Sequence, residues 1–372
     1  MTEDTIVVVY PSLFAENKID QLTKNIKKIL RIKNLKFGKI SKDDFLICVQ
    51  TSDPVFVSSA IRLLFGIKEI AIVKKIKNDF NTIVKEVGKI DSKLLLKGEK
   101  FFVKADGNAQ GFVIKDLELA VTSELIQKNQ KISAKSGTEK KYDKLLQIYV
   151  TKSNAYVSIF LDEGLGGTVN NSQEQKTVCN ISDEFSAVSC LETIKQGFEV
   201  NPIICYETRE DLIHLVKIID RILPRMLNSE IHLYFQKIPK FGKRSSDILT
   251  KNLLLTDITI KFARERKISH VTLAISPLIF PTKFVELLQK KVFDAKMMPH
   301  VSLSGIDSEI LKNAREIGME KYLSTIEKLS KKNFSNIKLK KPTAKLQSMS
   351  KIKVSLGPNN IHDMLDSLEI EH

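Results

Sequence analysis

Apolar residues in the first 75 positions alternate between the spacing of strands and the spacing of helices. Short β-branched or apolar runs predict strands over residues 5–10, 35–40, 44–50 and 67–73. Apolar side chains every three or four positions predict helices over residues 15–30 and from Asp53 and Pro54 onward. A turn is expected at 41–43. This β-α-β-β-α-β order predicts a ferredoxin-like domain over residues 1–75.

A second block extends to residue 170 and combines helices with a pair of strands. Helices are predicted near residues 80–87 and over 115–128, and strands over 100–104, 145–151 and 155–161. Residues 132–141 are polar and are interpreted as a loop. The block ends at a glycine-rich junction, residues 164–167. We therefore expect a small α/β domain over residues 76–170.

From residue 176 onward, strands alternate with helices of ten or more residues. The predicted strands are 176–181, 200–205, 230–236, 270–275 and 300–303. The predicted helices are 185–196, 209–226, 246–266, 282–293 and 307–317. This alternation predicts a parallel sheet with helices on both faces over residues 171–330. Residues 331–372, rich in Lys and Ser, are interpreted as a basic C-terminal tail.

The chain is strongly basic. Its 372 residues include 59 Lys and Arg against 44 Asp and Glu, for a formal net charge of +15. The excess is shared between the two halves of the chain, so no single tail explains it. A folded surface of this kind attracts polyanions, and we predict that the partner is RNA.

Cysteine usage and the chain start indicate a cytoplasmic protein. The cysteines Cys48, Cys179, Cys190 and Cys205 form no Cys-x-x-Cys pair, which is typical of a reducing compartment. The first residues lack the basic and apolar regions of a signal peptide, and no apolar run is long enough to span a membrane. Cys190, on a predicted helix, is the one cysteine with any case as a nucleophile.

The loop after the first strand of the parallel sheet is where an open α/β fold binds phosphates. Glycines there usually let backbone N–H groups reach the phosphate oxygens. Residues 181–188 contain no glycine, and Asp183 and Glu184 place negative charge where a phosphate would lie. The same residues suit an N-cap and a first helical turn. Ser182 and Ser186 therefore stay as weak nucleotide-binding candidates, ATP stays as a candidate cofactor, and no catalytic or metal-binding residue is predicted.

Several segments together, in order and spacing, resemble one known family. They are Phe65-Gly66-Ile67, residues 101–124, Tyr142-Asp143 through Val157-Ser158, Gly164-Leu165-Gly166-Gly167, and residues 196–202, 304–307, 314–318 and 341–346. They resemble the tRNA 4-thiouridine synthetases, the ThiI family, over roughly residues 5–347. The resemblance implies a ferredoxin-like domain, a THUMP RNA-binding domain over 76–170, and a Rossmann-like, parallel-sheet PP-loop domain (adenine nucleotide alpha hydrolase-like) over 171–330. It further implies that the first two domains dock tRNA and that the third uses ATP and a cysteine persulfide to thiolate uridine.

The chain departs from the family in the residues of that chemistry. Of the PP-loop pattern Ser-Gly-Gly-x-Asp-Ser, only the last serine matches, at Ser186. Residues 253–255 and 275–278, where the family carries cysteines, hold no thiol. Beside Lys104, residues 105–107 read Ala-Asp-Gly where the resemblance implies arginines. The third domain is therefore expected to be a degenerate PP-loop domain.

Lysines cluster around one edge of the second domain and are the predicted RNA contacts. They are Lys74, Lys75, Lys77, Lys97, Lys100, Lys104 and Lys115. Phosphate contacts of this kind give salt-dependent affinity without base specificity. Three functions stay open: a tRNA- or RNA-binding protein accessory to tRNA modification, an active ATP-dependent tRNA sulfurtransferase with an external sulfur donor, and a scaffold that pairs with an active paralogue or with a second copy of itself.

Overall fold

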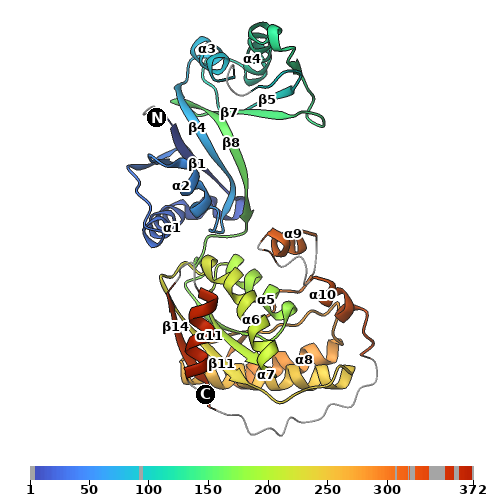
Figure 1. Ribbon diagram of the computed structural model, residues 1–372. Coiled ribbons are helices and arrows are strands. Elements are labelled where there is room, and N and C mark those ends of the chain that lie inside the picture. The colour runs from blue at the N-terminus through green and yellow to red at the C-terminus, as the bar shows by residue number, and fades with distance from the viewer. Residues whose placement is uncertain are drawn as a thin grey trace. The chain divides into compact units, whose positions relative to one another are not determined.

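The chain forms two compact units in the computed structural model, Met1–Gly166 and Gly167–His372, each built on its own sheet (Figure 1). The structure describes residues 5–91, 95–305, 308–316, 318, 323–334, 348–355 and 360–370. The first unit has a mainly antiparallel sheet and the second a mainly parallel one. The predicted fold class, α/β with α+β, is thereby confirmed.

The first unit begins with the predicted β-α-β-β-α-β order. Its elements are β1 (Thr5–Pro11), a short 3-10 helix (Leu13–Lys18), α1 (Ile19–Ile32), β2 (Ile40–Asp43), β3 (Leu46–Gln50), α2 (Pro54–Ile61) and β4 (Ile67–Lys77). The predicted start of α2 is confirmed, because the Asp53 side chain accepts a hydrogen bond from Phe56 N at 3.3 Å and Pro54 occupies the first helical position.

The hairpin between β2 and β3 lies later in the chain than predicted. The prediction of a strand over 35–40 is wrong, because residues 35–39 have no regular structure. The turn falls on Asp44 and Phe45 instead of 41–43, and Asp44 adopts φ 52°. A two-residue hairpin turn requires such positive φ values, which Asp tolerates better than most residues.

The unit continues through α3 (Phe80–Asp91), β5 (Lys100–Gly107), α4 (Ile114–Lys128), β6 (Lys135–Ser136), β7 (Lys144–Val150) and β8 (Asn154–Gly166), with a short 3-10 helix (Gln130–Ile132) before β6. All of its strands join one eight-stranded sheet in the order β2-β3-β1-β4-β8-β7-β5-β6. β4 and β8, with 11 and 13 residues, are the longest strands that the structure describes, and β4 contacts both α2 and α3. The segment interpreted as a loop, 132–141, contains β6 and a tight turn.

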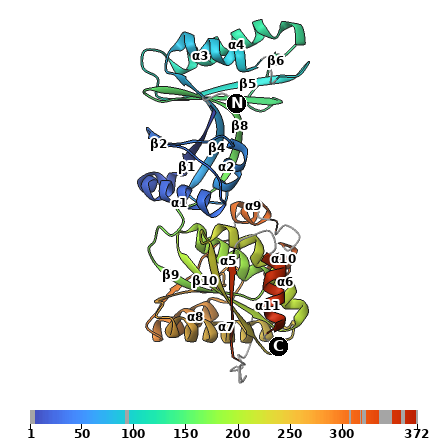
Figure 2. The same ribbon diagram turned by 60° about the vertical axis from the view of Figure 1, so that its left-hand side comes forward.

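Helices cover one face of this sheet. Side chains of β5 and β7 that point toward α3 and α4 form a buried cluster with Ile83, Val87, Leu117, Val121 and Leu125. Figure 2 shows α3 and α4 side by side along that face. The opposite face carries a second buried cluster that, in the described part of the chain, draws on strand residues alone, including Val8, Ala71, Val73 and Tyr156. We call this second face the helix-free face.

The second unit contains a doubly wound parallel sheet. Its strands are β9 (Lys176–Ile181), β10 (Glu199–Tyr206), β11 (Glu230–Lys237), β12 (His270–Thr272), β13 (Met298–His300) and β14 (Ser350–Ser355), in the order β13-β12-β9-β10-β11-β14. Helices α5 (Glu184–Lys195), α6 (Arg209–Ile222), α7 (Ser245–Glu265), α8 (Thr282–Asp294), α9 (Ser308–Glu316) and α10 (Leu323–Ser330) follow the strands. The strand order reverses between β9 and β12, which is where open α/β sheets bind ligands.

Part of the segment interpreted as a tail joins this unit. β14 pairs antiparallel with β11, and α11 (Asn360–Ile370) packs against α6 and β14. Residues 341–346, which carried part of the family resemblance, lie outside the described residues, as do Ile306 and Asp307.

The carboxylate of Asp43 connects the β2–β3 hairpin to the β7–β8 hairpin. Its Oδ2 accepts hydrogen bonds from Thr151 Oγ1 at 3.0 Å, from Asn154 Nδ2 at 2.7 Å and from the Tyr156 hydroxyl. Thr151 and Tyr156 are buried. Near this network the Tyr149 ring lies 5.5 Å from the ring of Tyr10, although two strands separate β7 from β1, so the sheet curves over its helix-free face.

We predict that Asp43→Ala lowers the free energy of unfolding by about 2 kcal/mol or more, because buried hydroxyl groups lose a charged acceptor. Urea unfolding followed by tyrosine fluorescence measures this change. Asp44→Asn is the matched control, since Asp44 is exposed, accepts only a long hydrogen bond from Lys152 N at 3.4 Å, and Asn also tolerates positive φ. Equal stability of the two variants would contradict the role assigned to Asp43.

Candidate functional site

The predicted lysines lie on different faces of the first unit. On β5, the side chains of Phe101, Val103 and Ala105 join the helix-covered cluster, so the alternate residues Lys100 and Lys104 lie on the helix-free face. On β4, Ile76 joins the helix-covered cluster, so its neighbours Lys75 and Lys77 also lie on the helix-free face. Strand alternation therefore brings these four lysines to the same face of the sheet.

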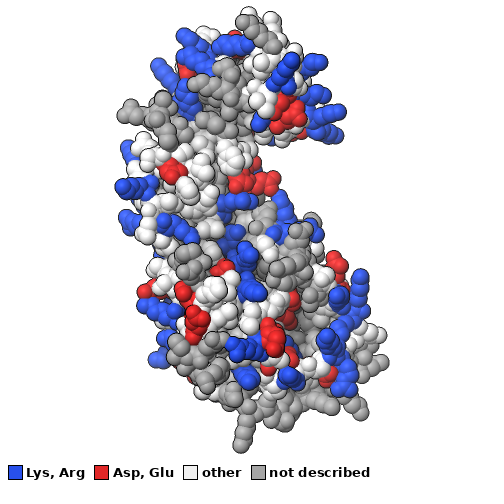
Figure 3. All heavy atoms as spheres, viewed as in Figure 1, with Lys and Arg blue, Asp and Glu red and all other residues white. Residues whose placement is uncertain are grey.

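The remaining predicted lysines are placed differently. Lys74 lies on the helix-covered face, where its ammonium is 2.7 Å from Glu86 of α3. Lys115 forms an ion pair with Glu118 on α4. Lys97 is exposed in the turn before β5. Figure 3 shows Lys and Arg side chains projecting from the part of the first unit that carries α3, α4 and β5.

Sequence reasoning missed an aromatic pair beside Lys100 and Lys104. Phe102, which lies between these lysines on β5, stacks with Tyr142, with ring centroids 5.9 Å apart and an interplanar angle of 24°. The alternation along residues 100–104 could have shown that Phe102 shares a face with Lys100 and Lys104. Its partner Tyr142 is distant in the sequence, however, and only the folded chain brings the two rings together.

A cavity of about 760 Å³ lies at the switch point of the second unit, beside the carboxyl end of β9. Its walls include both nucleotide-binding candidates, Ser182 and Ser186, and the aromatic rings of Phe185, Phe241 and Phe280. The sequence therefore located the loop that borders the cavity. It did not identify the residues that α7 and α10 contribute to the same walls.

Three backbone N–H groups of this loop, those of Ser182, Asp183 and Ser186, are satisfied by the loop's own side chains. Ser186 Oγ accepts hydrogen bonds from Ser182 N at 2.8 Å and from Asp183 N at 3.0 Å. The Asp183 carboxylate accepts a hydrogen bond from Ser186 N at 2.8 Å, which completes a capping box at the start of α5. A phosphate placed here would compete with these side chains for the same donors.

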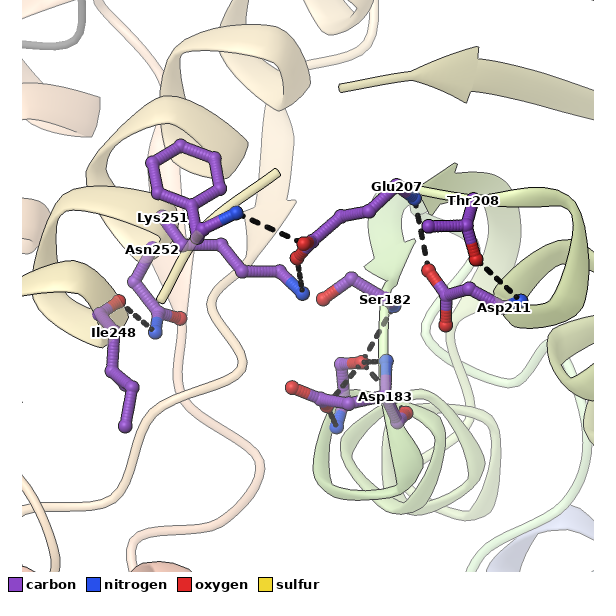
Figure 4. A network of polar contacts seen from close by, with 10 residues as sticks. Ser182, Asp183, Glu207, Thr208, Asp211, Ile248, Lys251 and Asn252 are labelled. Carbon is purple, nitrogen blue, oxygen red and sulfur yellow. Dashed lines mark hydrogen bonds and ion pairs between the residues drawn. The ribbon is translucent and has the colours of Figure 1, made fainter. Parts of the chain in front are cut away.

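The charges nearest the loop form ion pairs (Figure 4), while Lys243, Lys328 and Lys332 also line the cavity. Lys251 of α7 lies 2.8 Å from Glu207, which follows β10. Burial opposes the positive charge of Lys251, but the carboxylates of Asp183, Glu207 and Asp211 outweigh it and raise the lysine's pKa. Glu207 also accepts a hydrogen bond from Phe241 N at 3.0 Å. Lys251 therefore already has carboxylate partners.

Cysteine chemistry is not supported at the one position considered for it. Cys190 is fully buried in α5, and its hydrogen bond with Cys179 together with burial raises its pKa well above the ordinary value. A thiolate nucleophile needs the opposite environment, so the weak case for Cys190 is contradicted. Among the described residues, no group of His, Cys, Asp and Glu could hold a metal ion. The described helices include none that is long and apolar enough to cross a membrane.

The two units thus have a mixed sheet with helices on one face and a doubly wound parallel sheet, and solved structures share this architecture. PH1313 from Pyrococcus horikoshii Ot3 superposes with a TM-score of 0.63 and 16% identity over 84% of this chain and 99% of that chain. A 4-thiouridine synthetase, solved as an RNA complex with bound ATP, superposes with a TM-score of 0.61 and 15% identity over 89% of this chain and 88% of that chain. The predicted resemblance is confirmed at the level of the fold. No family model and no curated protein matches the chain in sequence.

We predict that the ion pair of Lys74 can be detected through Glu86. Hydrogen bonds from Lys74 and Lys89 lower the pKa of Glu86 from 4.5 to about 2. Because the folded-state pKa is depressed, the stabilisation by this carboxylate is present above pH 4.5 and is lost as the pH falls toward 2. The difference in unfolding free energy between the natural protein and Glu86→Gln should therefore shrink over that range. A difference that is independent of pH would show that Glu86 is held by neither Lys74 nor Lys89.

Proposed function

We propose that this protein binds RNA, with tRNA as its partner, through the helix-free face of its first unit. The observation that carries the proposal is the placement of Lys75, Lys77, Lys100 and Lys104 on one face. These lysines come from strands that are not neighbours, so the charge extends across the sheet. Likeness in fold to a protein solved in complex with RNA supports the choice of polyanion.

The distribution of carboxylates supports the same face. Lys74 and Lys115, which lie outside it, are neutralised by Glu86 and Glu118. An ammonium that already has a carboxylate partner gains less from a phosphate, because the existing pair must be broken or shared. The lysines of the helix-free face are therefore expected to supply most of the binding free energy, by releasing counterions from the RNA.

We predict that Lys100→Gln combined with Lys104→Gln weakens binding to whole tRNA and reduces the salt slope of log K by about 2. Lys74→Gln combined with Lys115→Gln is the matched control, since it removes the same charge from paired positions. Fluorescence anisotropy with labelled tRNA at several salt concentrations compares the two. Equal losses in both variants would mean that only net charge matters, and absence of tRNA affinity at low salt would refute the proposal.

We further propose that the second unit does not use a nucleoside triphosphate. The protein would then act in tRNA modification as a binding or accessory factor. The loop of Ser182 to Ser186 supports this, because its own side chains occupy the N–H donors of Ser182, Asp183 and Ser186. Asp183 and Glu184 add charges that repel a phosphate chain. Lys251, held by Glu207, supplies no unbalanced positive charge beside the loop, and the other lysines of the cavity, Lys243, Lys328 and Lys332, do not belong to the loop.

Calorimetry with ATP and Mg²⁺ should therefore show no saturable binding, and the protein should not catalyse ATP–pyrophosphate exchange in the presence of tRNA. The tRNA titration described above, performed on the same preparation, confirms that the protein is folded and competent. Tight ATP binding or measurable exchange would favour the alternative of an active tRNA sulfurtransferase that obtains sulfur from an external donor.

A further inference from the structure

A second cavity of the second unit, of about 500 Å³, lies between α6 and α11 beside the carboxyl ends of β10 and β11. Its volume is within the range of cavities that hold small organic ligands. The switch-point cavity takes its walls from other helices, α5, α7 and α10. The apolar walls of the second cavity include Leu212 and Ile213 of α6 and Leu365 and Leu368 of α11.

Tyr206, the last residue of β10, contributes a polar group to this apolar cavity. Tyr206 is 6% exposed, and in the described part of the chain its hydroxyl has no hydrogen-bond partner. Burial alone raises the pKa of Tyr206, so the hydroxyl stays protonated and able to donate at neutral pH. A ligand acceptor would therefore restore a hydrogen bond that the folded chain does not supply.

Lys237 supplies a positive charge to the same cavity. It ends β11 and is the register partner of Tyr206 in the parallel ladder, so both side chains leave the same face of the sheet. Lys237 is exposed and, among the residues that the structure describes, forms no ion pair. Arg209, the first residue of α6, also lines the cavity. A hydroxyl donor and an ammonium beside apolar walls suit a ligand with an anionic head and an apolar body.

Acidic residues at the start of α6 limit the charge of such a ligand. Glu210 and Asp211 lie in the first turn of this helix. They repel a dianionic phosphate more strongly than a monoanionic carboxylate. The turn also has its own cap, because Thr208 Oγ1 accepts a hydrogen bond from Asp211 N at 3.2 Å. The anionic head therefore depends on side chains of the cavity wall rather than on the helix N-terminus.

We propose that this cavity binds a small amphipathic carboxylate. Its apolar chain lies between α6 and α11, and its carboxylate accepts a hydrogen bond from Tyr206 and pairs with Lys237. The inference goes beyond the proposed RNA binding, which belongs to the first unit. It assigns to the second unit a ligand that needs neither the loop of Ser182 to Ser186 nor a phosphate group.

Calorimetry with octanoate and with 1-octanol tests the two parts of the site. The natural protein should bind octanoate saturably and about tenfold more tightly than the neutral alcohol of the same length. Lys237→Gln should lower the affinity for octanoate to that for octanol, because it removes the charge that distinguishes the two ligands. Tyr206→Phe should weaken octanoate binding severalfold, because it removes the hydroxyl donor and keeps the ring.

Two variants are matched controls and should bind octanoate like the natural protein. Lys217→Gln removes an exposed charge of α6 that does not line the cavity. Tyr234→Phe removes the hydroxyl of a tyrosine on β11 that is also 6% exposed but whose ring lies under Arg266. Matching thermal melting curves of all four variants exclude a loss of folding as the reason for lost binding.

Three results would overturn the inference. They are the absence of saturable octanoate binding, equal affinity for octanoate and octanol, and tighter binding of octyl phosphate than of octanoate, which would assign a phosphate ester instead. Each leaves the proposed RNA binding intact, since the tRNA titration tests that function separately and on the other unit.

Discussion

The antiparallel ladder between β4 and β8 is the interaction on which the first unit depends. It extends from Ile67, opposite Gly166, to Lys77, opposite Asn154. It therefore joins the part of the sheet that contacts α2 to the part that contacts α3. The register shifts at two places, between Ile67 and Glu69 and between Ile72 and Val73. A bulge of this kind increases twist, which helps the sheet curve over its helix-free face. Strand alternation along the same ladder decides which lysines point away from the helices.

Much of the fold could be predicted because long apolar patterns determine it locally. Helices α1 to α9 and the strands β9 to β12 follow the periodic burial of apolar side chains and were predicted. Helices α10 and α11 were not predicted, and β13 lies two residues earlier than the predicted strand over 300–303. β14 was not predicted, because Ser350–Ser355 contributes only Ile352 and Val354 to the core and its conformation depends on the edge offered by β11. The turn at Asp44 was misplaced because its backbone conformation, not its hydrophobicity, determines where the chain reverses.

The candidate sites were predicted only in part, for a related reason. The sequence identifies the lysines but does not show which are available to a ligand. In the folded chain Lys74 is paired with Glu86, whereas strand alternation exposes Lys104. In the second unit, the capping interpretation of Asp183 was available from the sequence. The sequence could not show that Ser186 Oγ accepts hydrogen bonds from both Ser182 N and Asp183 N, because these contacts depend on the path of the loop.

The helix-free face carries lysines and an aromatic ring on the same strand, β5. The proposed contacts between lysines and phosphates would act on any RNA and weaken with salt. Residues 100, 102 and 104 alternate with core residues, so one strand presents a lysine, a ring and a second lysine in a row at spacings of about 6.6 Å. The same alternation that buries Phe101 and Val103 under α4 therefore places charge and ring together on the opposite face.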